Sequence, residues 1–281
     1  MKFSLTVIAA VAAHVSAHGV ITEIQGANNV TMPGLSVQDG TPRDCATPRC
    51  GAEADTSIIR TKEMGTNKAT ALGRTNGGGP VDADKAISMF IGGSGAGAST
   101  DTQANKRQLS ALVGGGNQGS NSGSTSQGQK TPQGTTEQGV AKAAGTGAQS
   151  GLPTTADDGT ITMTFHQVNQ DGAGPLTAQI DATSGGKDPS AFQDAQVTQN
   201  VPGIGIGGLS AATTTDFPVK VQMPQGMTCQ GSAGGARNVC VVRLQNSALA
   251  GPFGGSAAFT QSPAAKKRAV EHNLRKRVVG A

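Results

Sequence analysis

Two histidines, His18 and His166, are the residues whose type and position point most directly to chemistry. Cleavage after Ala17 makes His18 the first residue of the mature chain, where its α-amine and ring Nδ1 can chelate one metal ion. Besides His18, the mature chain holds two histidines, His166 and His272, and His272 lies in a basic tail. His166 is therefore the structured partner, and the resulting three nitrogens suit copper. The alternative is that His166 is an ordinary strand histidine and that His18 is an accident of cleavage.

The first 17 residues have the features of a secretory signal peptide. Lys2 supplies the positive start, Leu5 to Ala13 the apolar stretch, and Val15-Ser16-Ala17 the small-residue cleavage pattern. This apolar stretch is too short to span a bilayer. A hydrophobic tail of the glycolipid-anchor type is absent, so no membrane anchor is expected. The sequence therefore predicts a secreted, extracellular protein, with the cell wall as a candidate location.

Four cysteines on an oxidising export route predict two disulfides, with three possible pairings. Cys45 and Cys50 are close enough to close a local loop, and so are Cys229 and Cys240. A zinc site is the competing interpretation, but neither spacing matches a common zinc motif.

The composition excludes several functional classes. The 281 residues carry a net charge of +4, but without the leader and the last eighteen residues the body holds 15 basic and 17 acidic residues. The body therefore gives no reason to expect nucleic-acid binding. Tyr and Trp are absent, which removes their platforms for stacking on bases or sugars. An ordinary hydrolase would need a catalytic pair, and we find no such pair beyond aspartates in glycine turns.

The order of segments predicts one sandwich interrupted by an insertion. After the leader (1–17), residues 18–91 form its N-terminal part and include a loosely alternating strand and a short helix over 81–91. Residues 92–150 are rich in Gly, Ser, Thr and Gln and are expected to be mostly disordered. Residues 151–262 form the main part, and residues 263–281 form a basic tail.

The strand pattern of the main part predicts the fold class. In ITMTFHQV (161–168), Ile161, Met163 and Phe165 alternate with Thr162, Thr164 and His166. Repeated short strands with Gly/Pro turns then predict an all-β, antiparallel, immunoglobulin-like sandwich with long loops. The turn Gly251-Pro252-Phe253-Gly254-Gly255 is expected to place Phe253 at one end of this sandwich.

Dibasic sites are the remaining processing signals. They lie at Lys106-Arg107, Lys266-Lys267-Arg268 and Arg275-Lys276-Arg277. In a secreted chain such sites attract furin-like proteases, and the alternative is a solvated basic tail.

Long runs of the chain resemble a known family. These runs are GLPTTADDGTITMTFHQVNQDGAGPLTAQIDATSGG, NVPGIGIGGLSAATTTDFPVKVQMPQGMTC and NVCVVRLQNSALAGPFGGSAAFTQ, with sparser similarity in HGVITEIQG and GRTNGGGPVDA. They resemble the fungal appressorium-associated virulence factors, the Egh-type cell-surface proteins. The resemblance implies a secreted fungal protein connected with infection structures.

The mature His18 start, the disulfide-bonded sandwich and the in-strand His166 are also similar to lytic polysaccharide monooxygenases. This resemblance implies a copper brace of His18 and His166, with Phe259 as the axial aromatic residue and Gln261 near it. It also implies a cell-wall polysaccharide as partner, although the chain lacks the Tyr and Trp that this class presents to crystalline polymers.

These observations support two functions. The first is an infection-associated cell-surface protein with a copper site that oxidises a wall polysaccharide or binds copper without turnover. The alternative is a non-catalytic structural or interaction protein of the wall, with incidental histidines. The sequence names no substrate and no oligomeric state.

Overall fold

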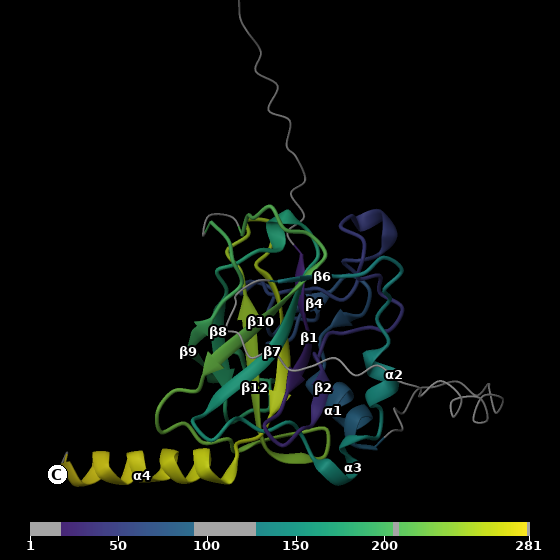
Figure 1. The fold of residues 1–281 in the computed structure, drawn as a ribbon. Helices are drawn as coiled ribbons and strands as arrows, with labels where there is room; N and C mark the ends of the chain where they lie inside the picture. The colour runs from purple at the N-terminus through teal and green to yellow at the C-terminus, as the bar shows by residue number, and fades with distance from the viewer. Residues whose placement is uncertain (1–17, 93–127, 205–207, 280–281) are drawn as a thin grey trace, which may run out of the picture.

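The computed structural model describes residues 18–92, 128–204 and 208–279, and these residues are built mainly from antiparallel strands (Figure 1). The strands are β1 (Gly19–Gln25), β2 (Thr31–Pro33), β3 (Ser57–Ile58), β4 (Arg74–Thr75), β5 (Gly79–Pro80), β6 (Gln129–Lys130), β7 (Thr160–Gln167), β8 (Thr177–Asp181), β9 (Phe192–Gln199), β10 (Thr215–Gln222), β11 (Gly231–Ala233), β12 (Ala236–Gln245) and β13 (Phe253–Phe259). The α-helices are α1 (Ala83–Gly92), α2 (Gly139–Ala143), α3 (Gly147–Ser150) and α4 (Pro263–Val279), and the 3-10 turns are η1 (Pro48–Cys50), η2 (Gln170–Gly172) and η3 (Pro189–Ala191).

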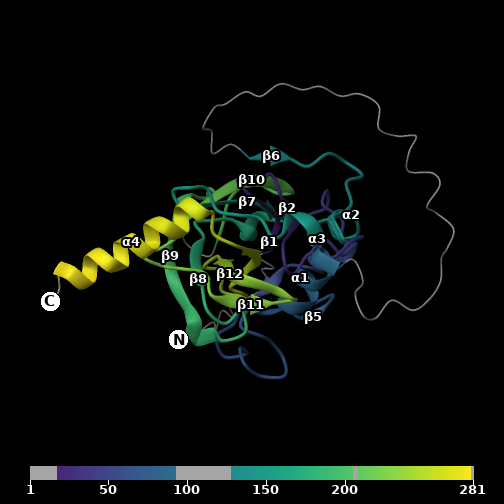
Figure 2. The ribbon, with the colours of Figure 1, turned by 90° about the horizontal axis from the view of Figure 1, so that it is seen from below.

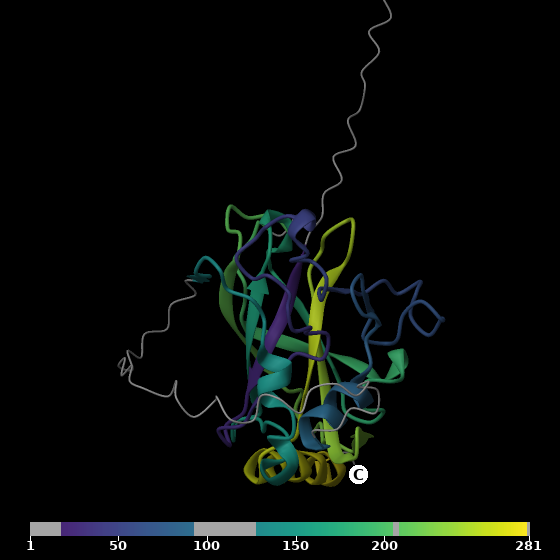
Figure 3. The same ribbon diagram turned by 90° about the vertical axis from the view of Figure 1, so that its right-hand side faces the viewer.

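The strands follow one continuous path in the order β2-β1-β7-β10-β9-β8-β12-β13-β3-β4-β5. Strand β9 joins the two halves, because it pairs with β10 on one side and with β8 on the other. The path folds back on itself so that β1 and β13 run beside each other (Figure 3). The predicted all-β antiparallel sandwich is confirmed.

Small residues on β13 allow this close approach. A Cβ at Gly255 would lie 2.7 Å from the backbone nitrogen of Ile21, so a larger residue there would push the two strands apart. Just after β2, the backbone N–H of Leu35 donates to the carbonyl of Ser256, which ties the two segments together. This contact brings the start of β1 near the start of β13.

The core lies between the two halves of the folded sheet. The alternation predicted for β7 is confirmed, since Ile161, Met163 and Phe165 are at most 2% exposed. From the other half, Leu244 and Phe259 are fully buried in the same apolar cluster. Burial of these side chains contributes on the order of 1.5–3 kcal/mol each.

A further layer covers the outer face of the sheet near the ends of β1 and β7. It consists of residues 36–56 and 129–137, which hydrogen-bond to each other through Arg43 N–H and the Thr135 carbonyl. Strand β6, at the start of the second segment, pairs with β10 in the sheet itself. The polar face of β7 is therefore buried at the C-terminal end of the strand, and His166 is 0% exposed.

The insertion expected to be disordered is partly ordered. Residues 93–127 of it lie outside the described residues, whereas residues 128–150 contain β6, α2 and α3. The Asp39 carboxylate accepts the backbone N–H groups of Val140 and Ala141 at 2.9 and 2.7 Å, which satisfies the start of α2. Tertiary contacts of this kind offset the conformational entropy lost on ordering the segment, and the composition of the segment does not reveal such contacts.

The basic tail is also helical rather than irregular. Pro263 occupies the first turn of α4, and the Ser262 hydroxyl accepts the backbone N–H of Ala265 at 3.1 Å. The residues that follow are mostly strong helix formers. Helix α4 projects away from the sandwich (Figure 2), and within the described residues no helix is both long and apolar enough to cross a membrane.

Candidate metal centre

The structure brings His18 and His166 onto the same face of two paired strands. Val20 on β1 lies opposite His166 on β7. Two residues earlier, the His18 carbonyl accepts the backbone N–H of Val168 at 3.0 Å. Side chains two residues apart share a face, so the two histidines are diagonal neighbours, a relation in which residues stand roughly 7–8 Å apart.

An aspartate on the adjacent strand orients His166. Asp216 on β10 lies opposite His166, and its Oδ1 is 2.7 Å from the imidazole Nδ1. In the neutral imidazole the Nδ1 proton is donated to this carboxylate, and Nε2 then bears the lone pair. Among the described residues Nε2 is buried and has no hydrogen-bond partner. A buried, unpaired acceptor costs free energy unless something binds it.

His18 has polar contacts on several sides. Its backbone nitrogen donates to Asn169 Oδ1 at 2.9 Å, and its Nδ1 lies 3.2 Å from Glu53 Oε1. Asn169 Nδ2 also donates to Glu53 Oε1 at 3.2 Å, which closes a three-residue cluster. Burial raises the pKa of Glu53 to about 7. The imidazole packs against the Phe253 ring, with centroids 4.4 Å apart.

A glycine in η2 permits the close packing at His18. A Cβ at Gly172 would lie 1.9 Å from the His18 carbonyl oxygen, so a side chain there would displace the start of β1. The cluster therefore depends on backbone packing as well as on side chains.

A buried ion cluster holds the covering layer in place. Arg43 donates to both carboxylate oxygens of Asp55, at 3.0 and 2.6 Å, and to Glu137 Oε2 at 3.0 and 2.8 Å. Its side chain is 5% exposed and that of Asp55 is fully buried. Arg43 thus links the two segments of the layer that lie over the outer face of β7.

The two other predicted site residues lie elsewhere. Phe259 is at the end of β13 opposite Cys240, six residues beyond Phe253, which is about 20 Å along a strand. Gln261 accepts the backbone N–H of Cys229 and donates to the carbonyl of Met227, both at 2.9 Å. The structure therefore does not bring Phe259 or Gln261 to the histidines.

The residues that sequence reasoning did not place at the site are Glu53, Asn169, Asp216 and Phe253. For Phe253 a signal existed, because the turn at 251–255 was expected to put its ring at one end of the sandwich. Asp216 lies on β10, outside the 161–168 strand whose alternation pointed to His166. Glu53 comes from a loop segment with no periodic pattern, so only the tertiary structure identifies it.

Both disulfides form local loops, between Cys45 and Cys50 and between Cys229 and Cys240. Of the three pairings that the sequence allowed, the structure thus selects the one that joins neighbours. Within residues 18–92, 128–204 and 208–279, no cluster of three or more His, Cys, Asp or Glu side chains is arranged to hold a metal ion. The dibasic sites near the C-terminus lie on α4, whereas Lys106-Arg107 is outside the described residues.

Comparison of the sequence with known proteins gives a family match and two similar relatives. The profile of the family described as Egh16-like virulence factor matches residues 16–254. The chain is 60% identical over 279 residues to the appressoria-specific virulence factor GAS2 of Pyricularia oryzae, covering 99% of this chain and 95% of that protein. It is 39% identical over 135 residues to the appressoria-specific virulence factor GAS1 of the same fungus, covering 47% of this chain and 51% of that protein. No solved structure matches the chain.

Proposed function

The chain belongs to the Egh16-like virulence factor family, and from this premise we propose that it is a secreted, infection-associated fungal protein that binds one copper ion at His18 and His166. The names of its relatives support a role in infection structures. Two disulfides and the leader pattern support secretion. The cell wall is the proposed location.

The main support for the copper site is the hydrogen bonding of the two ring nitrogens of His166. Its Nδ1 is fixed by Asp216, and its Nε2 is a buried acceptor without a partner among the described residues. A carboxylate behind an imidazole is the usual outer support of a metal-binding histidine. His18 stands diagonally beside it and, once the leader is removed, offers an amine and Nδ1.

This donor set fits copper without a third metal-binding side chain. Two imidazoles and an amine supply three nitrogens, which is the chemistry that Cu(II) prefers. Glu53 and Asn169 hold the nitrogen and ring of His18, Asp216 orients His166, and Phe253 shields one side of the pair. When bound there, copper supplies one-electron redox chemistry with oxygen or peroxide.

The proposed substrate is an uncharged cell-wall polysaccharide, and copper binding without turnover is the narrower form of the same proposal. The alternative, a non-catalytic structural or interaction protein of the wall, is favoured by one observation. The two histidines are 4% and 0% exposed, so an incoming polymer would have little direct access to them.

Copper binding to the chain processed to begin at His18 tests the proposal. We expect tight one-to-one binding by calorimetry and a type-2 copper spectrum by electron paramagnetic resonance. His166→Ala and a chain with one extra residue before His18 are each expected to lose both signals, whereas His272→Ala, on α4, is the matched control that retains them. Asp216→Asn is expected to weaken binding about 10–100-fold.

Unchanged binding in His166→Ala would refute the site. If copper binds as expected, incubation with insoluble wall polysaccharides, a reductant and oxygen then separates the two forms of the proposal. Release of oxidised oligosaccharides supports catalysis, and its absence supports copper binding alone.

A further inference from the structure

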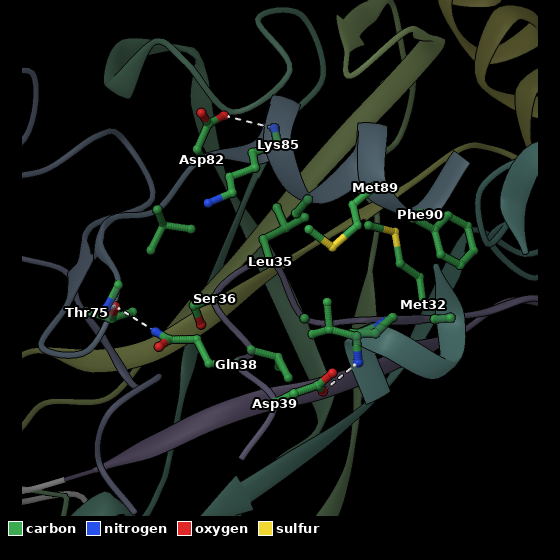
Figure 4. A pocket seen from close by; sticks show the side chains of 18 of the residues that line it. Met32, Leu35, Ser36, Gln38, Asp39, Thr75, Asp82, Lys85, Met89 and Phe90 are labelled. Carbon is green, nitrogen blue, oxygen red and sulfur yellow. Dashed lines mark hydrogen bonds between the residues drawn. The ribbon is translucent and has the colours of Figure 1, made fainter. Parts of the chain in front are cut away.

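A cavity lies away from the histidines, between α1, α2 and the segment that follows β2. Its volume is about 370 Å³, which falls within the range of small-molecule sites. The wall of this cavity includes Met32, Leu35, Met89 and Phe90 (Figure 4). From this cavity we propose a binding site for an uncharged amphiphile with an alkyl chain of medium length, independent of the copper proposal.

The cavity has an apolar side and a polar side. Figure 4 shows Met32, Met89 and Phe90 gathered on one side, and Ser36 and Gln38 on the other. Met32 and Phe90 are 1% and 3% exposed, so they form a fixed apolar wall. Methionine side chains adapt to the shape of a flexible ligand. This arrangement suits a molecule that is apolar at one end and polar at the other.

The polar side holds a group that lacks a partner. Ser36 is 6% exposed, and its hydroxyl oxygen is buried without a hydrogen-bond partner among the described residues. Beside it, Gln38 Nε2 donates to Thr75 Oγ1 at 3.2 Å. A buried hydroxyl left unpaired costs about 1–3 kcal/mol. A hydroxyl or ester oxygen of a ligand would remove that cost.

The charges at the rim favour a ligand without charge. Asp82 and Lys85 lie side by side at the rim and Asp39 lies on the opposite side of it (Figure 4), and all three side chains are exposed. Asp39 is held by its hydrogen bonds to the start of α2, and Asp82 Oδ1 accepts the Lys85 backbone N–H at 3.2 Å. Two fixed carboxylates against one ammonium repel an anionic head group, which argues against a fatty acid.

The volume sets the length of the chain. The cavity volume of about 370 Å³ lies near the lower end of the range for small-molecule sites, which favours a ligand of medium length. A ten-carbon alcohol is a ligand of this kind. In the proposed orientation its hydroxyl meets Ser36, and its alkyl chain lies along Met89 towards Phe90.

Binding of 1-decanol to the full chain, followed by NMR of labelled methionine methyl groups, tests the inference. We expect saturable shifts at Met32 and Met89, while Met163 in the main core stays unchanged. Ala86→Phe fills the cavity and is expected to weaken binding at least tenfold. Ala141→Phe, the same substitution at an exposed position outside the cavity, is expected to change binding less than twofold.

Two further arms test the head group. Ser36→Ala is expected to weaken decanol binding about fivefold, because one hydrogen bond is lost. Decanoate is expected to bind at least fivefold more weakly than decanol. The inference is overturned if Met32 and Met89 show no saturable shift, if Met163 moves equally, if Ala86→Phe binds like the wild type, or if decanoate binds as tightly as decanol.

Discussion

Glu53 makes the stability of the fold depend on pH, and replacing it by glutamine removes that dependence. Burial raises its pKa from 4.5 to about 7. A carboxyl group with a raised pKa in the folded state takes up a proton on folding, so its charging destabilises the fold as pH rises from 4.5 towards 7. A difference of about 2.5 at 1.36 kcal/mol for each pH unit gives roughly 3 kcal/mol as an upper estimate.

Urea unfolding followed by circular dichroism, at several pH values from 4 to 8, measures this effect. The protein used in this assay retains one residue before His18, so that the backbone nitrogen of His18 remains an amide. We expect the free energy of unfolding of the wild type, relative to Glu53→Gln, to fall between pH 4.5 and pH 7.5 by an amount that does not exceed about 3 kcal/mol.

Glu63→Gln serves as a control, because the contribution of Glu63 to stability changes with pH in the opposite direction. Hydrogen bonds from Arg74, together with Arg60, lower the pKa of Glu63, so its stabilising contribution is present above 4.5 and is lost as pH falls. A constant difference between wild type and Glu53→Gln across the pH range would refute the reasoning. It would mean that burial does not raise the pKa of Glu53 in the fold.

Two further perturbations concern the layer over the histidines and the disulfide next to Phe259. Arg43→Met is expected to destabilise the fold by about 3–5 kcal/mol, because it leaves the carboxylates of Asp55 and Glu137 without a cation. Urea unfolding measures this loss of stability. Adding D55N and E137Q to the same chain is expected to recover part of it. Replacing both Cys229 and Cys240 by alanine is expected to cost about 3 kcal/mol, from the entropy of an open loop of this length, with reduced wild type as the comparison; a loss below 1 kcal/mol would contradict this estimate.

Part of the sheet was predictable because some of its strands alternate. Strands β7 and β10 show apolar side chains at every second position, which is the signal of a half-buried strand. Strand β9 escaped prediction, because five of the eight residues in Phe192–Gln199 are polar and give it little buried surface. It forms because β8 and β10 pair with it on both sides, and that pairing is a tertiary property.

The candidate site was likewise predictable from the sequence only in part. His18 and His166 were found from the sequence, since cleavage position and strand alternation are both local features. Phe259 and Gln261 came from a resemblance, and the structure places them along β13 and beyond, away from the histidines, whereas Phe253 meets the His18 ring. A shift of six residues on one strand cannot be read from periodicity, because both phenylalanines share a face.

The sequence by itself determined the cysteine content, the strand pattern and the two histidines, and it predicted the leader, because each depends on residues close together in the chain. Only the tertiary structure decided that Glu53, Asn169 and Asp216 surround those histidines, since these residues come from separate segments. The same holds for the cavity at Ser36, whose wall is formed where α1 and α2 meet the segment after β2. Contacts between distant segments depend on packing, and packing is fixed only when the whole core has formed.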